Sequence, residues 1–313
     1  MHKIYNLILG NIITFLYLIK RNLRNNEKNN FEIIIFSHNR PLQLQCLLES
    51  AEEFVDKRIN INVLYKTNEK NNKSYQILQN NLKSNPKINF TCEESTFRKS
   101  LNLLLKKISQ KNLNNMHLLF FVDDQIIFRR ISLNKLNNLV KLATVCTLRF
   151  GLNTTWSFNL DKKQSLYSYK TKIKNEYISW YPNFKNDELS YVFSFDGSTI
   201  PIDLFRSFSN YLIFKGPNSL ESAMNYSGVV FKLLKNKISS FTKQGVINIV
   251  ISTVQNETKN RGDFLEIEYL NNLFLKNWKL KLDMKKVKDF NSPHSNEGVY
   301  LEKSNKIKLL KKK

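Results

Sequence analysis

Short apolar runs alternate with amphipathic helical patterns through the first half of the chain, and this alternation limits the fold more than any other feature. The runs are rich in β-branched and aromatic residues, which favours strands buried on both faces. They are residues 32–36, 61–65, 88–91, 118–122 and 144–150. Apolar positions recur at helical spacing in residues 41–54, 74–82, 96–108 and 133–142. This alternation predicts a layered, parallel α/β sheet with helices on both faces.

The second half of the chain is less regular. Two further apolar runs are expected to be strands, namely residues 191–195 and 246–251. Helical patterns cover residues 201–208, 218–226 and 264–275. Residues 151–190 are polar and aromatic, and we expect them to run over one face of the sheet.

Three parts of the chain follow from these patterns. Residues 1–30 are expected to form an apolar helix and a polar linker. Residues 31–290 are long enough for one α/β domain with a substantial core. Residues 291–313 are expected to form an irregular, basic C-terminal tail.

The charge balance favours anionic partners. The 313 residues include 49 Lys and Arg against 26 Asp and Glu, so the formal net charge is +23. Nucleic acid, anionic lipid and phosphorylated substrates all suit such a charge. The basic residues are spread through the chain together with Asn and Ile, and there is no Arg-rich arm. We therefore expect no dedicated nucleic-acid site.

Several common chemistries have no motif in this sequence. Glycine is scarce, and neither the dinucleotide-binding nor the P-loop glycine pattern occurs. The metalloprotease H-E-x-x-H and the hydrolase G-x-S-x-G motifs are also absent. The three cysteines have no metal-ligand spacing, which favours a reducing, cytoplasmic location.

Residues 4–19 are mostly apolar and are followed by Lys20 and Arg21. A helix of 16 residues spans roughly 24 Å, which is short of the ~30 Å hydrocarbon core of a bilayer. Three interpretations stay open: a helix packed on the domain, an interfacial helix on a membrane surface, or a short anchor. The first two are favoured, because Asn6 and Asn11 interrupt the apolar segment.

An acidic pair ends the apolar run 118–122. Asp123 and Asp124 follow it directly, at the end of a strand where open α/β sheets bind ligands. Two adjacent carboxylates repel each other, and a divalent cation with oxygen ligands, carrying a phosphate, would compensate them. The alternative is a solvated turn at the end of a strand.

Two basic segments are candidates for binding an anion. The first strand ends in Ser37-His-Asn-Arg-Pro41, ahead of a helix, where Arg40 would clamp a diphosphate with two bonds. Simple capping and turn formation is the alternative. Arg98 and Lys99 lie in the first turn of a helix, where a cation opposes the helix dipole, which hints at an electrostatic task.

These segments together resemble a nucleotide-diphospho-sugar transferase of the GT-A fold, similar to family 2 glycosyltransferases. The matching elements are residues 36–41, residues 95–102 and residues 121–125, the last a variant of the D-x-D motif. The resemblance covers roughly residues 31–230 plus His294, and it implies a GT-A-like (Rossmann-like) sheet.

The resemblance also implies roles for individual residues. A Mn²⁺ or Mg²⁺ ion would be held by Asp123, Asp124 and His294. The remaining residues expected around the nucleotide sugar are Ser37, His38, Asn39, Arg40, Thr67, Arg98 and Lys99, together with Asp123.

The sequence departs from the family pattern at three places. Gln125 stands at the third acidic position, and Lys66-Thr-Asn-Glu69 follows the second strand where the family often has an acid. Thr67 or Glu69 is then the substitute. No acidic pair for activating the acceptor is obvious, and Asp196 and Glu221 are the candidates, with Glu221 preferred.

The expected function is transfer of a sugar from a nucleotide-diphosphate donor to an acceptor hydroxyl, with help from a metal. Two alternatives stay open: a nucleotidyltransferase, which would want a glycine-rich basic loop after the first strand, and a non-catalytic basic protein on a membrane surface or nucleic acid. Donor, acceptor and stereochemical outcome are not determined by the sequence.

Overall fold

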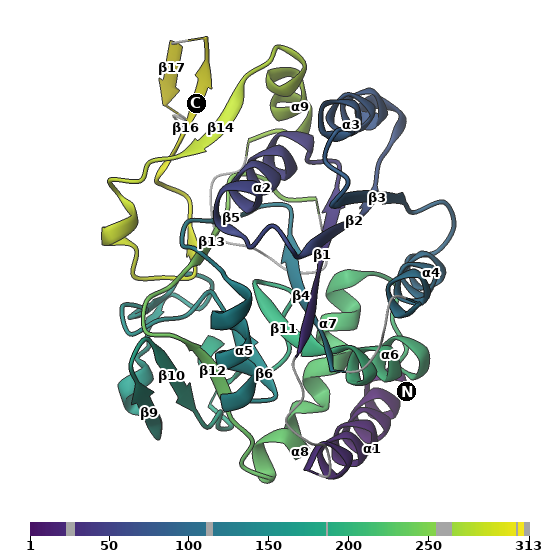
Figure 1. Cartoon of the computed structure of the whole chain (residues 1–313), viewed down its shortest axis with the longest axis vertical. Coiled ribbons are helices and arrows are strands. Elements are labelled where there is room, and N and C mark those ends of the chain that lie inside the picture. Colours follow the sequence, from purple (N-terminus) through teal and green to yellow (C-terminus); the bar gives the residue numbers. More distant parts are fainter. Residues whose placement is uncertain (23–28, 111–114, 186, 255–264, 305, 310–313) are drawn as a thin grey trace.

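A computed structural model describes residues 1–22, 29–110, 115–185, 187–254, 265–304 and 306–309 (Figure 1). Its centre is a nine-stranded sheet. Across the sheet the strands are β3 (Ile88–Cys92), β2 (Asn60–Lys66), β1 (Asn30–His38), β4 (Met116–Val122), β11 (Ser198–Pro201), β6 (Val145–Thr147), β12 (Ile238–Phe241), β10 (Tyr177–Trp180) and β9 (Thr171–Lys174).

The sheet is mixed. Strands β3, β2, β1 and β4 run parallel, as the strand–helix alternation predicts. Strand β11 is antiparallel to both of its neighbours, β4 and β6. Strands β10 and β9 come from the segment expected to cross one face. Strand β10 pairs antiparallel with β12, and β9 pairs antiparallel with β10 at the edge of the sheet.

Helices cover both faces of the sheet, which confirms the layered α/β architecture. One face is covered by α2 (Pro41–Phe54), α3 (Glu69–Leu82), α5 (Leu133–Leu142) and α9 (Ile267–Leu275). The other is covered by α4 (Phe97–Ser109), α6 (Ile202–Tyr211), α7 (Pro217–Tyr226), α8 (Gly228–Leu233) and α1 (His2–Asn22).

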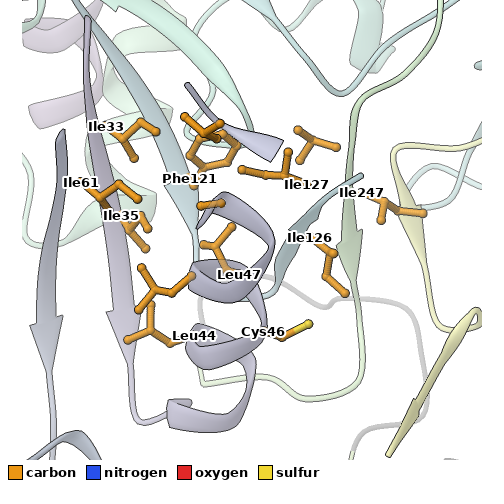
Figure 2. Close-up of a cluster of buried hydrophobic side chains, with 14 of the residues drawn as sticks. Ile33, Ile35, Leu44, Cys46, Leu47, Ile61, Phe121, Ile126, Ile127 and Ile247 are labelled. Atoms are coloured by element: carbon orange, nitrogen blue, oxygen red, sulfur yellow. The ribbon is translucent and has the colours of Figure 1, made fainter. Parts of the chain in front are cut away.

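Strand β1 shows why two cores form. Successive side chains of a strand point to opposite faces. Ile33 and Ile35 therefore enter the core beneath α2, while Ile34 and Phe36 enter the core beneath α4 and α6. Figure 2 shows the first core, where Leu44 and Leu47 of α2 pack against β1 and β4. Each such side chain contributes roughly 1.5–3 kcal/mol when fully buried.

The prediction of a strand at residues 191–195 is wrong. Phe193 and Phe195 are buried, as an apolar run predicts, but their backbone N–H groups donate to side chains of α7 and not to a strand. The acceptors are Asn225 and Glu221. Strand β11 begins only after Gly197, whose φ of 63° turns the chain.

Other boundaries differ by a few residues. The strand expected at residues 144–150 is confined to β6, and the one at 246–251 ends at Ile249 in β13 (Val246–Ile249). Helix α3 begins five residues earlier than expected, because the Asn68 side chain accepts from Asn71 N–H and caps it. Helix α9 begins at Ile267, and Phe264 lies outside the described residues.

The C-terminal segment is not an irregular tail. Strand β15 (His294–Ser295) pairs with β13, which pairs with β5 (Gln125–Ile127). Strands β14 (Lys279–Leu282), β16 (Val299–Lys303) and β17 (Lys306–Leu309) form an antiparallel sheet. Backbone pairing thus ties this segment to the domain, and the buried Leu280 and Leu301 join the core under α2.

The rest of the 151–190 segment is a short hairpin with 3₁₀ turns. The hairpin pairs β7 (Trp156–Ser157) with β8 (Lys162–Lys163). The 3₁₀ turns are Leu166–Ser168 and Glu188–Ser190, and a further one lies at Val287–Asp289.

Candidate active site

A crevice of about 390 Å³ opens at the carboxyl ends of β1, β2 and β4. This is the edge of the sheet where open α/β folds bind ligands. Its lining residues are Phe36, Ser37, His38, Arg40, Leu64, Lys66, Glu93, Phe97, Val122, Asp123, Lys215, Gly216, Pro217, Asn218 and Val254.

Asp123 is fixed at the floor of this crevice. Its side chain is fully buried, and its Oδ2 accepts hydrogen bonds of 2.9 Å from the Ser37 hydroxyl and from His38 N–H. Burial raises the pKa of Asp123 to about 6, although Arg40 and these hydrogen bonds oppose the shift. The carboxylate therefore holds the loop after β1 against the end of β4.

Arg40 spans both aspartates. One terminal nitrogen lies 2.6 Å from Asp123 Oδ1, and the other lies 2.8 Å from Asp124 Oδ2. Burial disfavours the charge of Arg40, but the two carboxylates outweigh it and raise its pKa. The compensation that adjacent carboxylates require is thus supplied by a guanidinium, whose planar fork suits two acceptors at once.

A chain of side-chain amides joins this pair to a third carboxylate. Gln125 Oε1 accepts from Val122 N–H at 3.0 Å, and its amide donates to Asn248 Oδ1 at 3.0 Å. The Asn248 amide in turn donates to Asp196 Oδ1 at 3.1 Å and reaches Asp124 Oδ1 at 3.4 Å. Gln125 therefore connects the end of β4 to Asn248 of β13.

The two candidate bases lie in one charged cluster. Asp196 is paired with buried Arg149 at 3.1 Å. Glu221, in the second turn of α7, accepts from Phe195 N–H at 2.6 Å. Burial and then the charge of Asp196 raise the pKa of Glu221 to about 7. Such a value suits a group that exchanges a proton near neutral pH.

The rim of the crevice is cationic. Lys66 and Lys215 are exposed there, and Lys66 Nζ lies 3.3 Å from Glu93. Burial, followed by the charges of Lys66 and Arg40, lowers the pKa of His38, so its neutral imidazole is favoured. Phe97 and Leu64 form an apolar wall of the crevice. The crevice is built for a ligand that is anionic at one end and apolar at another.

The three expected metal ligands do not converge. Asp123 is committed to Ser37, His38 and Arg40. His294 lies 3.9 Å from Asp196, beside Glu188 and Asn159, and lines a different hollow. Within the described ranges, no group of three or more His, Cys, Asp and Glu residues is placed to hold a metal.

Asp124 alone fits a cation that arrives with a phosphate. Its side chain is 17% exposed, and its Oδ1 has only the long 3.4 Å contact with Asn248. Mg²⁺ is commonly held by one or two carboxylates together with substrate phosphates and water. The donor set of this site therefore matches a substrate-borne ion at Asp124, and not a cage of protein ligands.

Arg98 and Lys99 are not crevice residues. The Arg98 guanidinium donates to the carbonyls of Ser209 and Asn210 in the last turn of α6 and of Leu212 just after it, and it lies 4.0 Å from the centre of the Phe214 ring. A cation is favourable at the C-terminus of a helix. This contact with α6 offsets the cost of placing Arg98 in the first turn of α4. Lys99 is exposed and lines no part of the crevice.

Two of the expected nucleotide contacts lie beside the crevice. Asn39 adopts a left-handed φ of 55°, accepts from Asn68 N–H, and faces a separate hollow of about 450 Å³. Thr67 bonds to the neighbouring Asn68 carbonyl and lines neither space. Glu69 opens α3, where it complements the helix dipole.

Asn248 and Arg149 contact Asp196 but were not among the residues predicted from the sequence, although the sequence contains a signal for both. Asn248 interrupts the apolar run 246–251, and Arg149 interrupts the run 144–150. A buried polar group in an apolar strand must be paired, so each predicts a nearby partner. Lys66, Lys215 and Asn218 had no such signal, because exposed polar residues are common after strands and before helices.

No protein-family model matches the chain, and no curated protein matches its sequence. Solved structures do resemble it. TarS of S. aureus matches with a TM-score of 0.45 and 16% identity over 69% of this chain and 36% of the TarS chain. TarS 1–349 in complex with UDP-GlcNAc matches with a TM-score of 0.45 and 14% identity over 74% of this chain and 60% of that one.

GalNAc-T7 with UDP, GalNAc and Mn²⁺ matches with a TM-score of 0.43 and 11% identity over 69% of this chain and 44% of its own. The matched region thus spans between 36% and 60% of the length of these chains. Each of these likenesses is partial, with a TM-score of 0.43 to 0.45 and an identity of 11% to 16%.

Proposed function

We propose that this chain transfers a sugar from a nucleotide-diphosphate donor to an acceptor hydroxyl. The observation that carries the proposal is that Arg40, which bridges Asp123 and Asp124, lines a crevice with lysines at its rim. This places a fixed guanidinium, with two lysines nearby, at the sheet edge where a diphosphate would bind.

The crevice supplies separate surroundings for the two ends of such a donor. The diphosphate would lie among Arg40, Lys66 and Lys215. The nucleoside would lie along the apolar wall of Phe97 and Leu64. The sugar would then extend toward Asp124, Asn248 and Asp196, which are linked by hydrogen bonds and offer acceptors and a donor for hydroxyl groups.

Glu221 is the proposed base for an inverting transfer. The acceptor oxygen forms a bond to the anomeric carbon of the sugar, the bond from that carbon to the diphosphate breaks, and Glu221 takes the acceptor proton. Its pKa of about 7 lets it exist as a carboxylate at neutral pH and still be a stronger base than an ordinary glutamate. Arg149 and Asp196 set its electrostatic surroundings.

The leaving group is a nucleoside diphosphate, and its developing charge must be stabilised. Arg40 is charged and lines the crevice, and because its two terminal nitrogens already hold the aspartates, Lys66 and Lys215 would supply the other positive charges around the diphosphate. A Mn²⁺ or Mg²⁺ ion carried by the diphosphate would add a second positive charge there, and Asp124 is the residue that would hold it.

A thermal-stability screen tests the proposal. The chain is heated with UDP-, GDP-, TDP- and CMP-sugars, with and without Mn²⁺, and the sugars carried by TarS and GalNAc-T7 come first. A ligand at 100 times its Kd adds about 2.7 kcal/mol of stability. We expect one nucleotide class to raise the Tm and to donate its sugar to an added acceptor. A rise in Tm with DNA, and none with any nucleotide sugar, would favour a nucleic-acid-binding protein instead.

A further inference from the structure

Helix α1 is turned with its polar side toward the protein. The Asn6 side chain donates to Ile213 O and accepts from Ile213 N–H, both at 2.8 Å. Asn11 accepts from Val230 N–H at 2.8 Å and donates to Tyr226 O at 3.2 Å. The residues that interrupt the apolar segment in the sequence are therefore the ones that attach it to α7, α8 and the loop before α7.

Small residues complete this inner side. A Cβ atom added at Gly10 would meet the Cβ of Ser227 at 2.9 Å, so the two backbones approach closely there. Thr14 is fully buried. At the end of the helix, Arg21 donates to Thr144 and to Val140 O. The contacts therefore run along the whole of α1.

The outer side of α1 is apolar and exposed. Ile4 is 63% exposed, Ile8 58% and Leu16 60%, and Ile12, Phe15 and Ile19 lie in the same row. Their spacing of three and four residues makes one stripe on a helix. We call this row the outer stripe of α1. Ile13 and Leu18 are buried on the inner side, so α1 is apolar on both sides, and the outer stripe is the side that stays exposed.

The charges around the outer stripe are positive. Helix α1 contains the exposed Lys3 and Lys20 and no acidic residue, whereas Arg21 is turned toward the domain. Helix α8, which packs beside it, exposes Val229 and Leu233 and is followed by Lys235 and Lys237 (Figure 1). An apolar stripe with cationic flanks is the pattern of helices that lie in the interface of anionic bilayers.

We propose that the outer stripe binds an anionic bilayer with α1 lying flat in the plane of the membrane surface. By length and composition, His2–Arg21 would also suit a membrane span. The packing excludes that orientation, because the bonds from Asn6, Asn11 and Arg21 hold the domain beside the full length of the helix. A span would carry α7, α8 and their connecting loops into hydrocarbon, where irregular backbone exposed to lipid is not tolerated.

Binding in this way would also orient the crevice. Helix α7, against which α1 packs, begins with crevice residues and carries Glu221. The crevice would therefore be held at a fixed height above the bilayer. The membrane proposal itself does not depend on sugar transfer, because it rests on α1 alone.

Vesicle sedimentation with the full chain tests the proposal. We expect binding to vesicles of phosphatidylcholine with about 30% phosphatidylglycerol, weaker binding to phosphatidylcholine alone, and loss of the difference at high salt. The double substitution Ile8→Glu/Phe15→Glu should weaken binding at least about tenfold, because charges replace apolar contacts. Leu103→Glu is the matched control, since Leu103 is an equally exposed apolar residue on α4.

Two results would overturn the proposal. One is equal binding of wild type and the double variant at equal Tm. The other is a wild-type dimer in solution that the double variant dissociates without any vesicle binding, because the outer stripe would then belong to a contact between copies.

The depth of the helix ends tests its orientation. A fluorophore on Ile4→Cys or on Ile19→Cys, in a Cys92→Ser background, should be quenched equally by a shallow lipid quencher, because a flat helix keeps both ends at one depth. Cys46 and Cys146 are buried and stay in place. Unequal quenching, with one end deep or on the far side, would overturn the flat orientation.

Discussion

The guanidinium of Arg40 lies 2.8 Å from the carboxylate of Asp124, across the gap between the loop after β1 and the end of β4. The pair connects the two sequence segments that carry the resemblance to sugar-nucleotide transferases. It also leaves the second oxygen of Asp124 only loosely engaged, at 3.4 Å from Asn248. Unlike Asp123, Asp124 thus has a carboxylate oxygen that is free to coordinate a cation.

Asp124→Asn should abolish the gain in nucleotide affinity that Mn²⁺ or Mg²⁺ provides while leaving the fold intact. An amide oxygen is neutral and a weaker ligand for these ions. Calorimetric titration of the preferred nucleotide, with and without Mn²⁺, measures the effect. Glu53→Gln removes one exposed acid of α2 that does not line the crevice and serves as the control. Metal-enhanced binding of normal strength in Asp124→Asn would show that the metal, if used, is held elsewhere.

Glu221→Gln should retain donor binding and lower turnover by at least about 10²-fold, because only the proton acceptor is lost. In the wild type, turnover should rise as the pH increases through about 7, since Glu221 must be deprotonated to act. Initial rates across pH 5 to 9 measure both effects. If turnover stays within a few-fold while Asp196→Asn abolishes it, the base is Asp196.

The stability of the protein should also depend on Glu221. Its pKa is raised from 4.5 to about 7 on folding, so the folded state binds this proton more tightly than the unfolded state. The resulting stabilisation is complete below about pH 4.5 and is lost as the pH rises through about 7. Tm measurements from pH 4 to 8 should therefore show a smaller fall for Glu221→Gln, whose side chain does not titrate. Parallel Tm curves for both proteins would contradict the raised pKa.

Arg98→Met should destabilise the fold without weakening nucleotide binding. It removes charge-assisted hydrogen bonds to three carbonyls at the C-terminal end of α6, each worth about 1.5–3 kcal/mol at most. Lys99→Met, on the next residue, is exposed and should change stability by no more than about 0.5 kcal/mol. Denaturant unfolding gives the stabilities and titration gives the affinities. Reduced nucleotide affinity in a folded Arg98→Met protein would return Arg98 to the binding site.

The first half of the fold follows from the sequence because its signals are local. Helix α2 and helix α5 have the predicted limits, and β1 to β4 lie at their predicted apolar runs. The prediction of a strand at residues 191–195 was wrong because burial and strand pairing are separate properties. Phe193 and Phe195 are buried, but their N–H groups bond to side chains of α7, which no local pattern reveals.

The site was predictable where local patterns place its residues at the ends of parallel strands. Arg40 and the acidic pair follow strand ends, and parallel strands bring such ends together. The position of His294 beside Asp196 depends on β15 pairing with β13, a contact between distant segments. Arg98 looked available for an anion because its acceptors are carbonyls more than 100 residues away.

If Arg40 contacts the diphosphate of the donor, the affinity that the diphosphate adds must depend on the Arg40 guanidinium. The preferred nucleoside diphosphate and its parent nucleoside are titrated into wild type and Arg40→Lys, with Arg58→Lys at an exposed ion pair as the control. We predict that the diphosphate binds much more tightly than the nucleoside to wild type, and that this difference shrinks at least about tenfold in Arg40→Lys, because lysine lacks the planar fork. An unchanged difference in Arg40→Lys would contradict the account.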